Sequence, residues 1–313
     1  MVVKVVIVLF FGGIVSAFAQ KDSLQNTHFV SYDEKVISSI YYQDISNSFQ
    51  VNFNTAGEAN YLGLEPNRRA QIGLNLSYKF IDISYGYSPE FLAENKDNEG
   101  SKLFSLGTRF YYKKWMQSLS FINQTGFYIT DGETELEFPR LRTTKFGGTT
   151  SYIFNDKFSF KTIANQKEWQ TKSAGSFIPN LSIYYTNFDL NDGNSENKSN
   201  IYLVSLSPSY FYNWVINNHF LISGGLAVGG GFNSVDGDFA PIYEGSLSLK
   251  MGYNSDSFYT FVNLNYIDFV QDSEAAIRLD DQIVTFKFTA GYRFNPPKKV
   301  KEYYDKANKK IGL

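Results

Sequence analysis

The sequence predicts an all-β fold: a transmembrane antiparallel β-barrel of about 12 to 14 strands, with an N-terminal arm and a short basic C-terminal tail. Alternation of apolar and polar residues recurs in many segments of about ten residues, each bounded by turn-forming residues. Aromatic residues make up 18% of the chain, with 23 tyrosines and 29 phenylalanines, more than the core of a soluble domain needs. Beyond residue 20, no apolar run approaches the length of a membrane-spanning helix.

Residues 1–19 have the pattern of a signal peptide. Lys4 provides a basic start, an apolar stretch runs from 5 to 15, and Ala17-Phe18-Ala19 fits a signal-peptidase site before Gln20. The apolar stretch is too short to span a bilayer comfortably, which disfavours the alternative of a retained membrane helix. We therefore expect an exported protein. The chain has no cysteine, so neither a lipid anchor at the cleavage site nor a disulfide is expected.

An N-terminal arm is predicted over 20–47. Residues 21–35 show no clear period, so they are expected to lie in the periplasm or to enter the lumen. The segment 36–43 has strand character, but barrels of this kind normally have an even number of strands. This segment is the one most readily placed outside the wall, and the barrel is therefore predicted over 48–294.

The alternation is clearest in the last predicted strand, 282–294. One face carries Val284, Phe286, Phe288, Ala290, Tyr292 and Phe294, and the other carries Thr285, Lys287, Thr289, Gly291 and Arg293. In a soluble β-sandwich the second face would be strongly charged. Small polar residues with an occasional lysine or arginine suit a narrow, wet lumen, while the apolar face suits lipid.

About fourteen segments qualify as strands by this pattern. They are 36–43, 48–56, 69–79, 81–88, 102–113, 115–128, 142–154, 157–167, 176–187, 201–213, 219–231, 242–253, 258–269 and 282–294. Tight turns are predicted at 113–114, 155–157, 217–218 and 254–256, and long loops at 90–101, 130–138, 233–240 and 271–281. Short periplasmic turns and longer outer loops are the expected arrangement. The alternation changes phase between 167 and 200, which indicates a miscounted strand there.

The residues after the last predicted strand, 295–313, form a basic tail. Pro296 and Pro297 stop the strand, and the tail carries Lys298, Lys299, Lys301, Lys306, Lys309 and Lys310 against Glu302 and Asp305. We expect a short, solvated helix in the periplasm, and contact with an anionic partner is the alternative.

The polar faces of the alternating strands predict a positively charged lumen. The candidate lumen-lining residues are Lys79, Arg109, Lys113, Lys145, Lys161, Lys250, Lys287 and Arg293, against Asp82 and Glu244. If the lumen conducts ions, this bias predicts a preference for anions. The predicted long loops are acidic, so solvated loop acids, or divalent cations that bridge them to lipopolysaccharide, are expected there.

One polar cluster is a candidate inward loop. It consists of Lys167, Glu168, Trp169, Lys172 and Gly175. A loop folded into the lumen would form a constriction or contact a ligand, with Gly175 supplying the backbone freedom to turn. The plainer alternative, which we favour, is a salt-bridge network that only holds one loop in place.

The same region resembles a known family. The chain reads Asn165-Gln166-Lys167-Glu168-Trp169-Gln170-Thr171-Lys172-Ser173-Ala174-Gly175-Ser176-Phe177, followed by the strand Ser182-Ile183-Tyr184-Tyr185. This is similar to a motif of Bacteroidota outer-membrane proteins catalogued only as a domain of unknown function, and the resemblance extends through Phe154-Asn155-Asp156-Lys157 to Gly291-Tyr292-Arg293-Phe294. It implies an outer-membrane barrel in that phylum and brings no activity, substrate or catalytic residue.

No catalytic, cofactor-binding or metal-binding residues are predicted. His28 lies in the irregular arm and His219 in a tight turn, whereas Ser173 and Ser176 belong to another segment, so a Ser/His/acid hydrolase is disfavoured. The glycines at 224–231 are not followed by a helix, which argues against a phosphate-binding loop. No cofactor is expected.

The predicted role is therefore that of an outer-membrane barrel without catalysis, either a narrow channel for small solutes or a structural anchor in the envelope. A membrane-embedded enzyme that modifies or hydrolyses lipid is the alternative. The expected partners are outer-membrane lipid, lipopolysaccharide and the barrel-assembly machinery, with an unidentified envelope protein as a further option and no nucleic acid.

Overall fold

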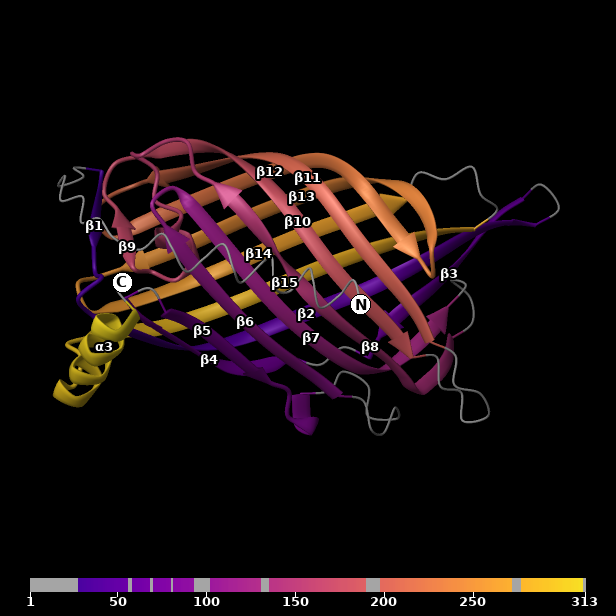
Figure 1. The fold of residues 1–313 in the computed structure, drawn as a ribbon, viewed down its shortest axis with the longest axis horizontal. Helices are drawn as coiled ribbons and strands as arrows, with labels where there is room; N and C mark the ends of the chain where they lie inside the picture. Colours follow the sequence, from indigo (N-terminus) through magenta and orange to yellow (C-terminus); the bar gives the residue numbers. More distant parts are fainter. Residues whose placement is uncertain are drawn as a thin grey trace. The chain divides into compact units, whose positions relative to one another are not determined.

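The computed structural model describes residues 28–55, 58–67, 70–79, 81–92, 102–130, 135–189, 198–271 and 277–311. The expected signal peptide, the start of the arm and parts of the long loops 90–101, 130–138 and 271–281 lie outside these residues. The described chain is almost entirely β-structure (Figure 1). The all-β prediction is confirmed.

The main sheet closes on itself. Of its 13 strands among the described residues, all except β3 form a ring, which leaves 12 in the wall, within the predicted range. In ring order these are β2 (Val36–Thr55), β4 (Gln71–Tyr78), β5 (Ile81–Tyr87), β6 (Lys102–Tyr112), β7 (Trp115–Thr130), β8 (Glu135–Tyr152), β10 (Ala174–Asp189), β11 (Lys198–Val215), β12 (Phe220–Val235), β13 (Asp238–Asn254), β14 (Phe258–Gln271) and β15 (Ile277–Phe294). Every neighbouring pair is antiparallel, and β15 pairs with β2 to close the ring.

The two ends of the barrel differ. We call the end where β2 begins and β15 ends the turn end, because short turns join β4 to β5 and β6 to β7 there; the opposite end is the loop end. At the loop end β12 and β13 are joined by a tight turn at Asp236 and Gly237, both with positive φ (51° and 106°). This pair fits a type I′ hairpin, so the predicted long loop over 233–240 is wrong: the strands continue almost to the tip.

The outer face carries the apolar side chains that the alternation predicts. On β15 the outward residues are apolar from Phe294 to Val284, which is about 34 Å along a strand and about 26 Å along the axis at a typical tilt of ~40°. Tyr292 is 53% exposed, Leu206 on β11 is 59% exposed and Leu247 on β13 is 57% exposed. A band of this height matches the hydrocarbon layer that a transmembrane barrel must cover. The fold is therefore that of a transmembrane β-barrel.

The wall begins earlier than predicted. The segment 36–43 is not outside the wall but is the first part of β2, which pairs with β15 on one side and with β4 on the other. The physical reason is that both faces of this part are apolar: Ile37 and Tyr41 point inward and are buried, while Ile40 on the outer face is 62% exposed. The arm therefore cannot extend to residue 47, and Val36–Thr55 is one strand rather than two.

An extra strand, β3 (Glu58–Pro66), forks the wall at the loop end. β2 pairs with β4 from Ile37 to Gln43 and with β3 from Phe49 onward. β7 likewise pairs with β6 up to Thr125 and with β3 from Phe127. β3 therefore takes the place of β4, β5 and β6 at the loop end, where the β2–β3 hairpin projects beyond its neighbours (Figure 1).

Residues 153–173, between β8 and β10, fold into the barrel instead of forming a wall strand. The predicted strand 157–167 is wrong, because this stretch contains the one-turn helix α2 (Lys161–Ala164). The predicted tight turn at 155–157 does bend, with Lys157 N donating to Asn155 Oδ1 at 3.0 Å, but it opens this inward segment rather than joining two wall strands. This inward segment explains why the alternation of apolar and polar residues changes phase after residue 167.

Three short elements remain among the described residues: β1 (Phe29–Ser31), β9 (Glu168–Gln170) and the 3₁₀ turn η1 (Glu90–Leu92). The helix α3 (Lys298–Ile311) belongs to a compact unit separate from the barrel and agrees with the predicted helical tail. No helix in the described part of the chain is both long and apolar enough to cross a membrane.

The closed ring predicts resistance to detergent. Since every wall strand is paired on both sides, the purified protein should stay folded in SDS at room temperature and migrate faster unboiled than boiled. Membranes separated by density should carry it in the outer-membrane fraction. Equal migration before and after boiling, together with recovery from the soluble periplasm, would contradict the closed transmembrane barrel.

Candidate functional site

The inward segment 153–173, which we call the lumen plug, is the most unusual feature of the barrel. Its strand β9 pairs antiparallel with β1, with Val30 opposite Trp169. Hydrogen bonds on either side continue this pairing, from Tyr32 N to Lys167 O and from Thr171 N to His28 O, both at 2.7 Å. The described end of the N-terminal arm is thus held by the plug at the turn end.

Apolar side chains anchor the plug in the lumen. Phe158, Ile163 and Trp169 are buried in one cluster. The wall residues of that cluster come from widely separated strands of the ring: Ile37, Ala174, Ile178, Leu221, Tyr259 and Phe261. Burial of a large side chain is worth about 1.5–3 kcal/mol, so these contacts provide much of the drive to fold inward. The plug therefore crosses the lumen and contacts wall strands on opposite sides of it.

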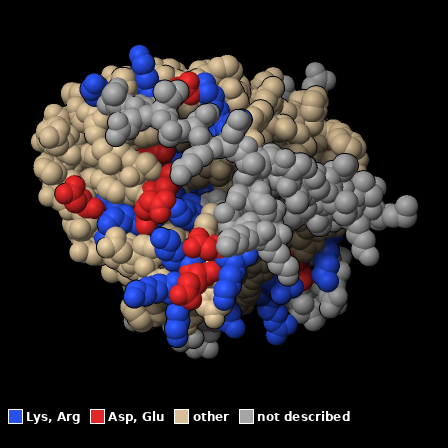
Figure 2. Space-filling view, turned by 60° about the vertical axis from the view of Figure 1, so that its left-hand side comes forward, with Lys and Arg blue, Asp and Glu red and all other residues tan. Residues whose placement is uncertain are grey.

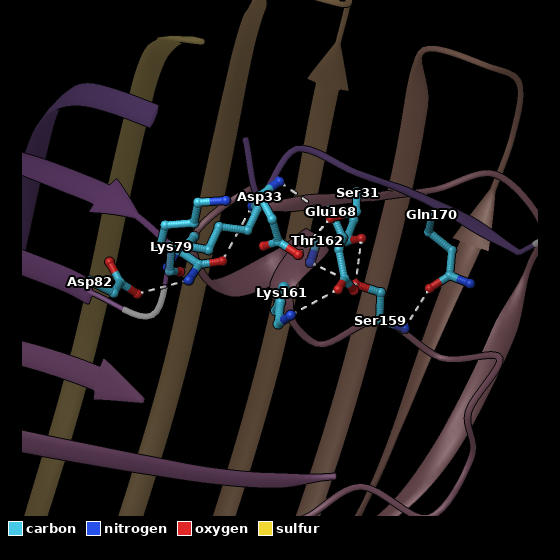
Figure 3. Close-up of polar contacts among 11 residues, drawn as sticks. Ser31, Asp33, Lys79, Asp82, Ser159, Lys161, Thr162, Glu168 and Gln170 are labelled. Carbon is cyan, nitrogen blue, oxygen red and sulfur yellow. Dashed lines mark hydrogen bonds and ion pairs between the residues drawn. The ribbon is translucent and has the colours of Figure 1, made fainter. Parts of the chain in front are cut away.

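The carboxylate of Glu168 organises one side of the plug (Figure 3). Ser159 Oγ donates to Glu168 Oε2 at 2.6 Å, and Lys161 Nζ binds Oε1 at 3.0 Å. Ser159 Oγ also accepts the backbone N–H of Thr162 at 3.1 Å, which satisfies one free donor at the start of α2. Burial lowers the pKa of Lys161, but the charges of Glu168 and Asp33 and the hydrogen bond to Glu168 together outweigh it, so this pKa ends above its ordinary value. Lys161 is therefore charged.

The other side of the plug is tied to β4, β5 and the turn between them. Asp82 Oδ1 accepts from Ser77 at 2.7 Å, and its Oδ2 accepts from Asn165 of the plug at 3.0 Å. Lys167 Nζ donates to the backbone carbonyl of Lys79. Burial lowers the pKa of Lys167 to about 8. Figure 2 turns this end of the barrel forward and shows acidic and basic side chains interleaved near the centre of the face.

Arg293, near the end of β15, fastens the plug to the wall. It is buried, and its guanidinium donates to Gln166 O at 3.1 Å and to Asn254 Oδ1 at 2.6 Å. The guanidinium also lies between two aromatic rings, 4.1 Å from the centroid of Tyr32 and 4.7 Å from that of Tyr259. Arg293 thus joins the arm, the plug and two wall strands through one side chain.

A cationic layer lies next to the plug on the inner wall, formed by Arg109, Lys250 and Lys287. Lys250 Nζ donates to the plug carbonyl of Ile163 at 2.9 Å, and Lys287 Nζ lies 3.6 Å from the ring centroid of Tyr41. Arg109 reaches Asp82 only at 4.0 Å. Among the described residues, Lys250 and Lys287 take part in no ion pair. The layer keeps an excess of positive charge.

At the loop end, opposite walls touch. Lys145 on β8 forms an ion pair with Asp281 on β15 at 2.6 Å, although these strands lie on opposite sides of the ring. The rings of Phe49 on β2 and Phe188 on β10, also opposite strands, pack edge to face with centroids 4.5 Å apart. We call these two contacts the loop-end closure.

The loop-end closure is embedded in apolar side chains but is not fully packed. Phe127, Leu141 and Ile201 pack around the two phenylalanines, and Leu203, Ile242 and Phe269 form a neighbouring cluster. A cavity of about 20 Å³ remains beside Lys145 and Asp281. This is room for about one water molecule, so the two walls meet with a small void between them.

The predicted lumen residues divide into two groups. Arg109, Lys145, Lys250, Lys287 and Arg293 lie on the inner face of wall strands. Lys161 lies on the plug, and Lys79 and Lys113 lie in turns at the turn end, both with positive φ. The assignment of Lys113 to the lumen is wrong because the strand ends at Tyr112, one residue before it.

The candidate inward loop is also divided. Lys167, Glu168 and Trp169 are buried in the plug, and Lys172 belongs to the same segment but is exposed. Gly175 lies on β10, on the outer side of the wall. A Cβ there would lie 2.4 Å from the hydroxyl oxygen of Tyr210, so this glycine makes room for an outward aromatic ring and does not turn a loop.

The sequence pattern does not identify two residues of the loop-end closure, Asp281 and Phe49. Asp281 falls in a predicted loop, and Phe49 in a strand whose inner face reads as apolar. The available signal was the register: extending the alternation of 282–294 backwards places Asp281 on the same face as Lys287. Nothing in the sequence says which residue meets it across the lumen.

The two histidines make structural contacts at the turn end. His219 lies in the β11–β12 turn, its Nδ1 is 2.8 Å from the carbonyl oxygen of Asn254, and its ring stacks on Tyr253. The backbone carbonyl of His28 accepts a hydrogen bond from Thr171 N of the plug. The described residues contain no group of three or more potential metal ligands.

These features define a class: a transmembrane β-barrel whose lumen is crossed by a plug at one end and by contacts between opposite walls at the other. The chain belongs to the family described as "Domain of unknown function (DUF4421)", whose sequence profile matches residues 20–294. The expected resemblance to a family of unknown function is thus confirmed, and the bacterial phylum stays a prediction. No curated protein matches the chain.

Several solved barrels are similar in outline. OmpT of Vibrio cholerae aligns at 10% identity and a TM-score of 0.33, covering 82% of this chain and 98% of its own. The outer membrane protease OmpT of Escherichia coli aligns at 9% sequence identity with a TM-score of 0.34, and the alignment covers 85% of this chain and 98% of the protease. An outer membrane channel from Pseudomonas putida F1 aligns at 10% sequence identity with a TM-score of 0.35, and the alignment covers 88% of this chain and 100% of the channel. At such low values no activity is transferred from them to this chain.

Replacing Arg293 with alanine should loosen the plug. The charge-assisted hydrogen bonds of the guanidinium are worth about 1.5–3 kcal/mol each, so opening of the plug should become easier by about 3 kcal/mol and its proteolysis about 100-fold faster. Trp169 reports this directly, because Trp115 and Trp214 are exposed and can be replaced with phenylalanine. Its emission should shift to longer wavelength in Arg293→Ala.

The exposed Arg142, which pairs with Asp189, provides the control Arg142→Ala. Unchanged emission and proteolysis would mean that Arg293 does not hold the plug.

Proposed function

We propose that this protein is a gated outer-membrane channel for small anionic solutes, here in its closed state. The observation that carries the proposal is the arrangement of the lumen: two closures made of non-covalent contacts, with a partly exposed layer of basic side chains between them. A barrel that served only as an anchor would need neither accessible charge in its lumen nor two separate closures.

The placement in the membrane rests on the barrel and on the sequence. The apolar band has the height of a hydrocarbon layer, and the expected signal peptide would export the chain. We place the turn end in the periplasm, because short turns are usual there and longer connections lie at the outer side. On this assignment the plug faces the periplasm and the loop-end closure faces the outside.

The loop-end closure has the properties of a gate. It depends on one ion pair and one pair of aromatic rings, and the adjacent cavity gives the side chains room to move. A hydrophobic constriction blocks ions because it excludes water, and it opens when the side chains separate. The plug, fastened at Arg293, Asp82 and Glu168, is the more firmly held of the two closures.

The selectivity follows from the charges left over inside. Lys145 and Asp281 neutralise each other, as do Lys161 and Glu168. Glu244 accepts from the hydroxyls of Ser205 and Ser207 and keeps its negative charge, so with Asp82 it offsets two of the three cations of the layer. The cationic layer remains, so the electrostatic barrier in the lumen should be lower for anions.

Opening the gate should produce conductance. In Phe49→Ala with Phe188→Ala, made together with Arg293→Ala to release the plug and reconstituted into planar bilayers, we expect the open probability to rise at least about tenfold over Arg293→Ala alone, because the edge-to-face contact and its exclusion of water are lost. The matched control is the outward pair Phe177→Ala with Phe232→Ala in the same background, which should behave as Arg293→Ala alone.

Under a KCl gradient the reversal potential of the opened variant should indicate anion preference. Adding Arg109→Glu should move it toward cations, whereas adding Lys113→Glu in the turn should not.

Two outcomes would contradict the proposal. If heat-modifiable, correctly folded gate variants conduct no more than wild type, the lumen is a fixed core and the barrel is an anchor. If the opened variant prefers cations, the cationic layer does not line the conducting path.

A further inference from the structure

We propose that the cationic layer is a binding site for a multivalent oxyanion, such as a phosphate or sulfate group. This rests on the proposed function for its purpose, since it names the class of solute that the lumen selects, but the binding itself requires no conduction. The site is formed by donors from β4, β6, β13 and β15.

The strand register brings two of the cations into one row. Lys287 on β15 lies opposite Asn263 on β14, and Asn263 lies opposite Lys250 on β13. On its other side Lys287 lies opposite Gln43 on β2, which lies opposite Gln71 on β4. Adjacent paired residues are about 4.5–5.5 Å apart, so the backbones of Lys250 and Lys287 lie roughly 10 Å apart on either side of Asn263. Their ammonium groups are directed at the plug carbonyl of Ile163 and at the ring of Tyr41. The spacing suits an anion that is held between two lysines.

Arg109 completes the cluster from the other side of the ring. It projects inward from β6, and its charge acts on both Lys250 and Lys287. Three like charges around one lumen repel one another, and the narrow wall desolvates them. A counter-anion in the centre would relieve this repulsion, which is the electrostatic reason to expect one.

Several donors in this layer are not fully used. Arg109 Nε and Gln71 Nε2 are buried and have no hydrogen-bond partner, although Gln71 Oε1 accepts from Ser105 at 3.0 Å. Gln71 is completely buried. Buried polar atoms are normally satisfied, so unused donors point to a missing acceptor. An oxyanion supplies several acceptor oxygens at once, and guanidinium and ammonium groups bind them strongly.

The neighbouring acid does not cancel the layer. Asp82 approaches Arg109 at 4.0 Å and keeps its negative charge, although its two oxygens also accept from Ser77 and Asn165. Glu244, further along β13, is held by two serine hydroxyls, and Asp281 is paired with Lys145. The three cations exceed the two carboxylates Asp82 and Glu244 by one charge, so this part of the lumen is net positive and favours an anion.

Equilibrium dialysis tests the site, because slow entry through the closures does not affect the end point. The folded, detergent-solubilised wild-type barrel is dialysed to equilibrium against radiolabelled sulfate, or against radiolabelled inorganic phosphate, in a constant background of chloride. We expect one equivalent of either oxyanion per chain. Lys250→Gln, Lys287→Gln and Arg109→Gln should each weaken binding at least about tenfold. Lys113→Gln, which removes a lysine from the β6–β7 turn, is the matched control and should bind as wild type.

The outcomes separate the two proposals. Absence of binding to wild type, or equal binding by all four variants, overturns the oxyanion site even if the gate variants conduct. Saturable binding that is lost in the lumen variants supports the site even if no variant conducts. Folding of each variant is checked by its gel shift on boiling, and Lys287→Arg, which keeps the charge, should retain binding within about threefold. Loss of binding in that folded variant would contradict recognition by charge.

Discussion

The pairing of β15 with β2 is the constraint on which the rest of the molecule depends. Lipid offers no partner for a backbone N–H or C=O, so a sheet can cross a membrane only if its first and last strands meet. Here they pair from Val36 opposite Phe294 to Phe53 opposite Ile277. This pairing uses β2 from Val36 to Phe53 and fixes which side chains of the two strands face the lipid and which face the lumen.

Closing a ring of this size leaves a lumen that wall side chains alone do not fill. The barrel fills it in two different ways. At the turn end the plug brings in its own core, centred on Phe158, Ile163 and Trp169, and its polar atoms are satisfied by Asp82, Glu168 and Arg293. At the loop end β3 replaces three wall strands, and the opposite walls approach until Lys145 meets Asp281.

The layer between the two closures differs in character from both. It carries the three cations Arg109, Lys250 and Lys287, of which only Arg109 approaches a carboxylate, that of Asp82 at 4.0 Å. Such an arrangement costs stability, because like charges in a narrow space repel and lose solvation. Side chains kept at such a cost point to a role in binding or selecting a solute, and this is the physical basis of the proposed channel.

The sequence predicts the local part of this account and not the long-range part. The alternation in 282–294 assigned Lys287 and Arg293 to the lumen correctly, because period-two order needs only one strand. The same rule gave a wrong result at 36–43, where the inward residues are apolar because they pack against the plug. It also gave a wrong result at 157–167, where the spacing of Phe158 and Phe160 resembles that of a strand although the segment lies inside the barrel. The contact between Lys145 and Asp281 could not be predicted, because it depends on which strands face each other across the closed ring.

A double-mutant cycle on Lys145 and Asp281 tests the central claim, that opposite walls of the barrel meet at the loop end. The free energy of unfolding in detergent is measured for wild type, Lys145→Met, Asp281→Asn and the double variant. A direct, buried ion pair predicts a coupling energy of about 2 kcal/mol, whereas the more exposed pair Arg142 and Asp189 should give about 0–1 kcal/mol. A coupling energy near zero for Lys145 and Asp281 would mean that the walls stand apart and that the lumen is open at this end.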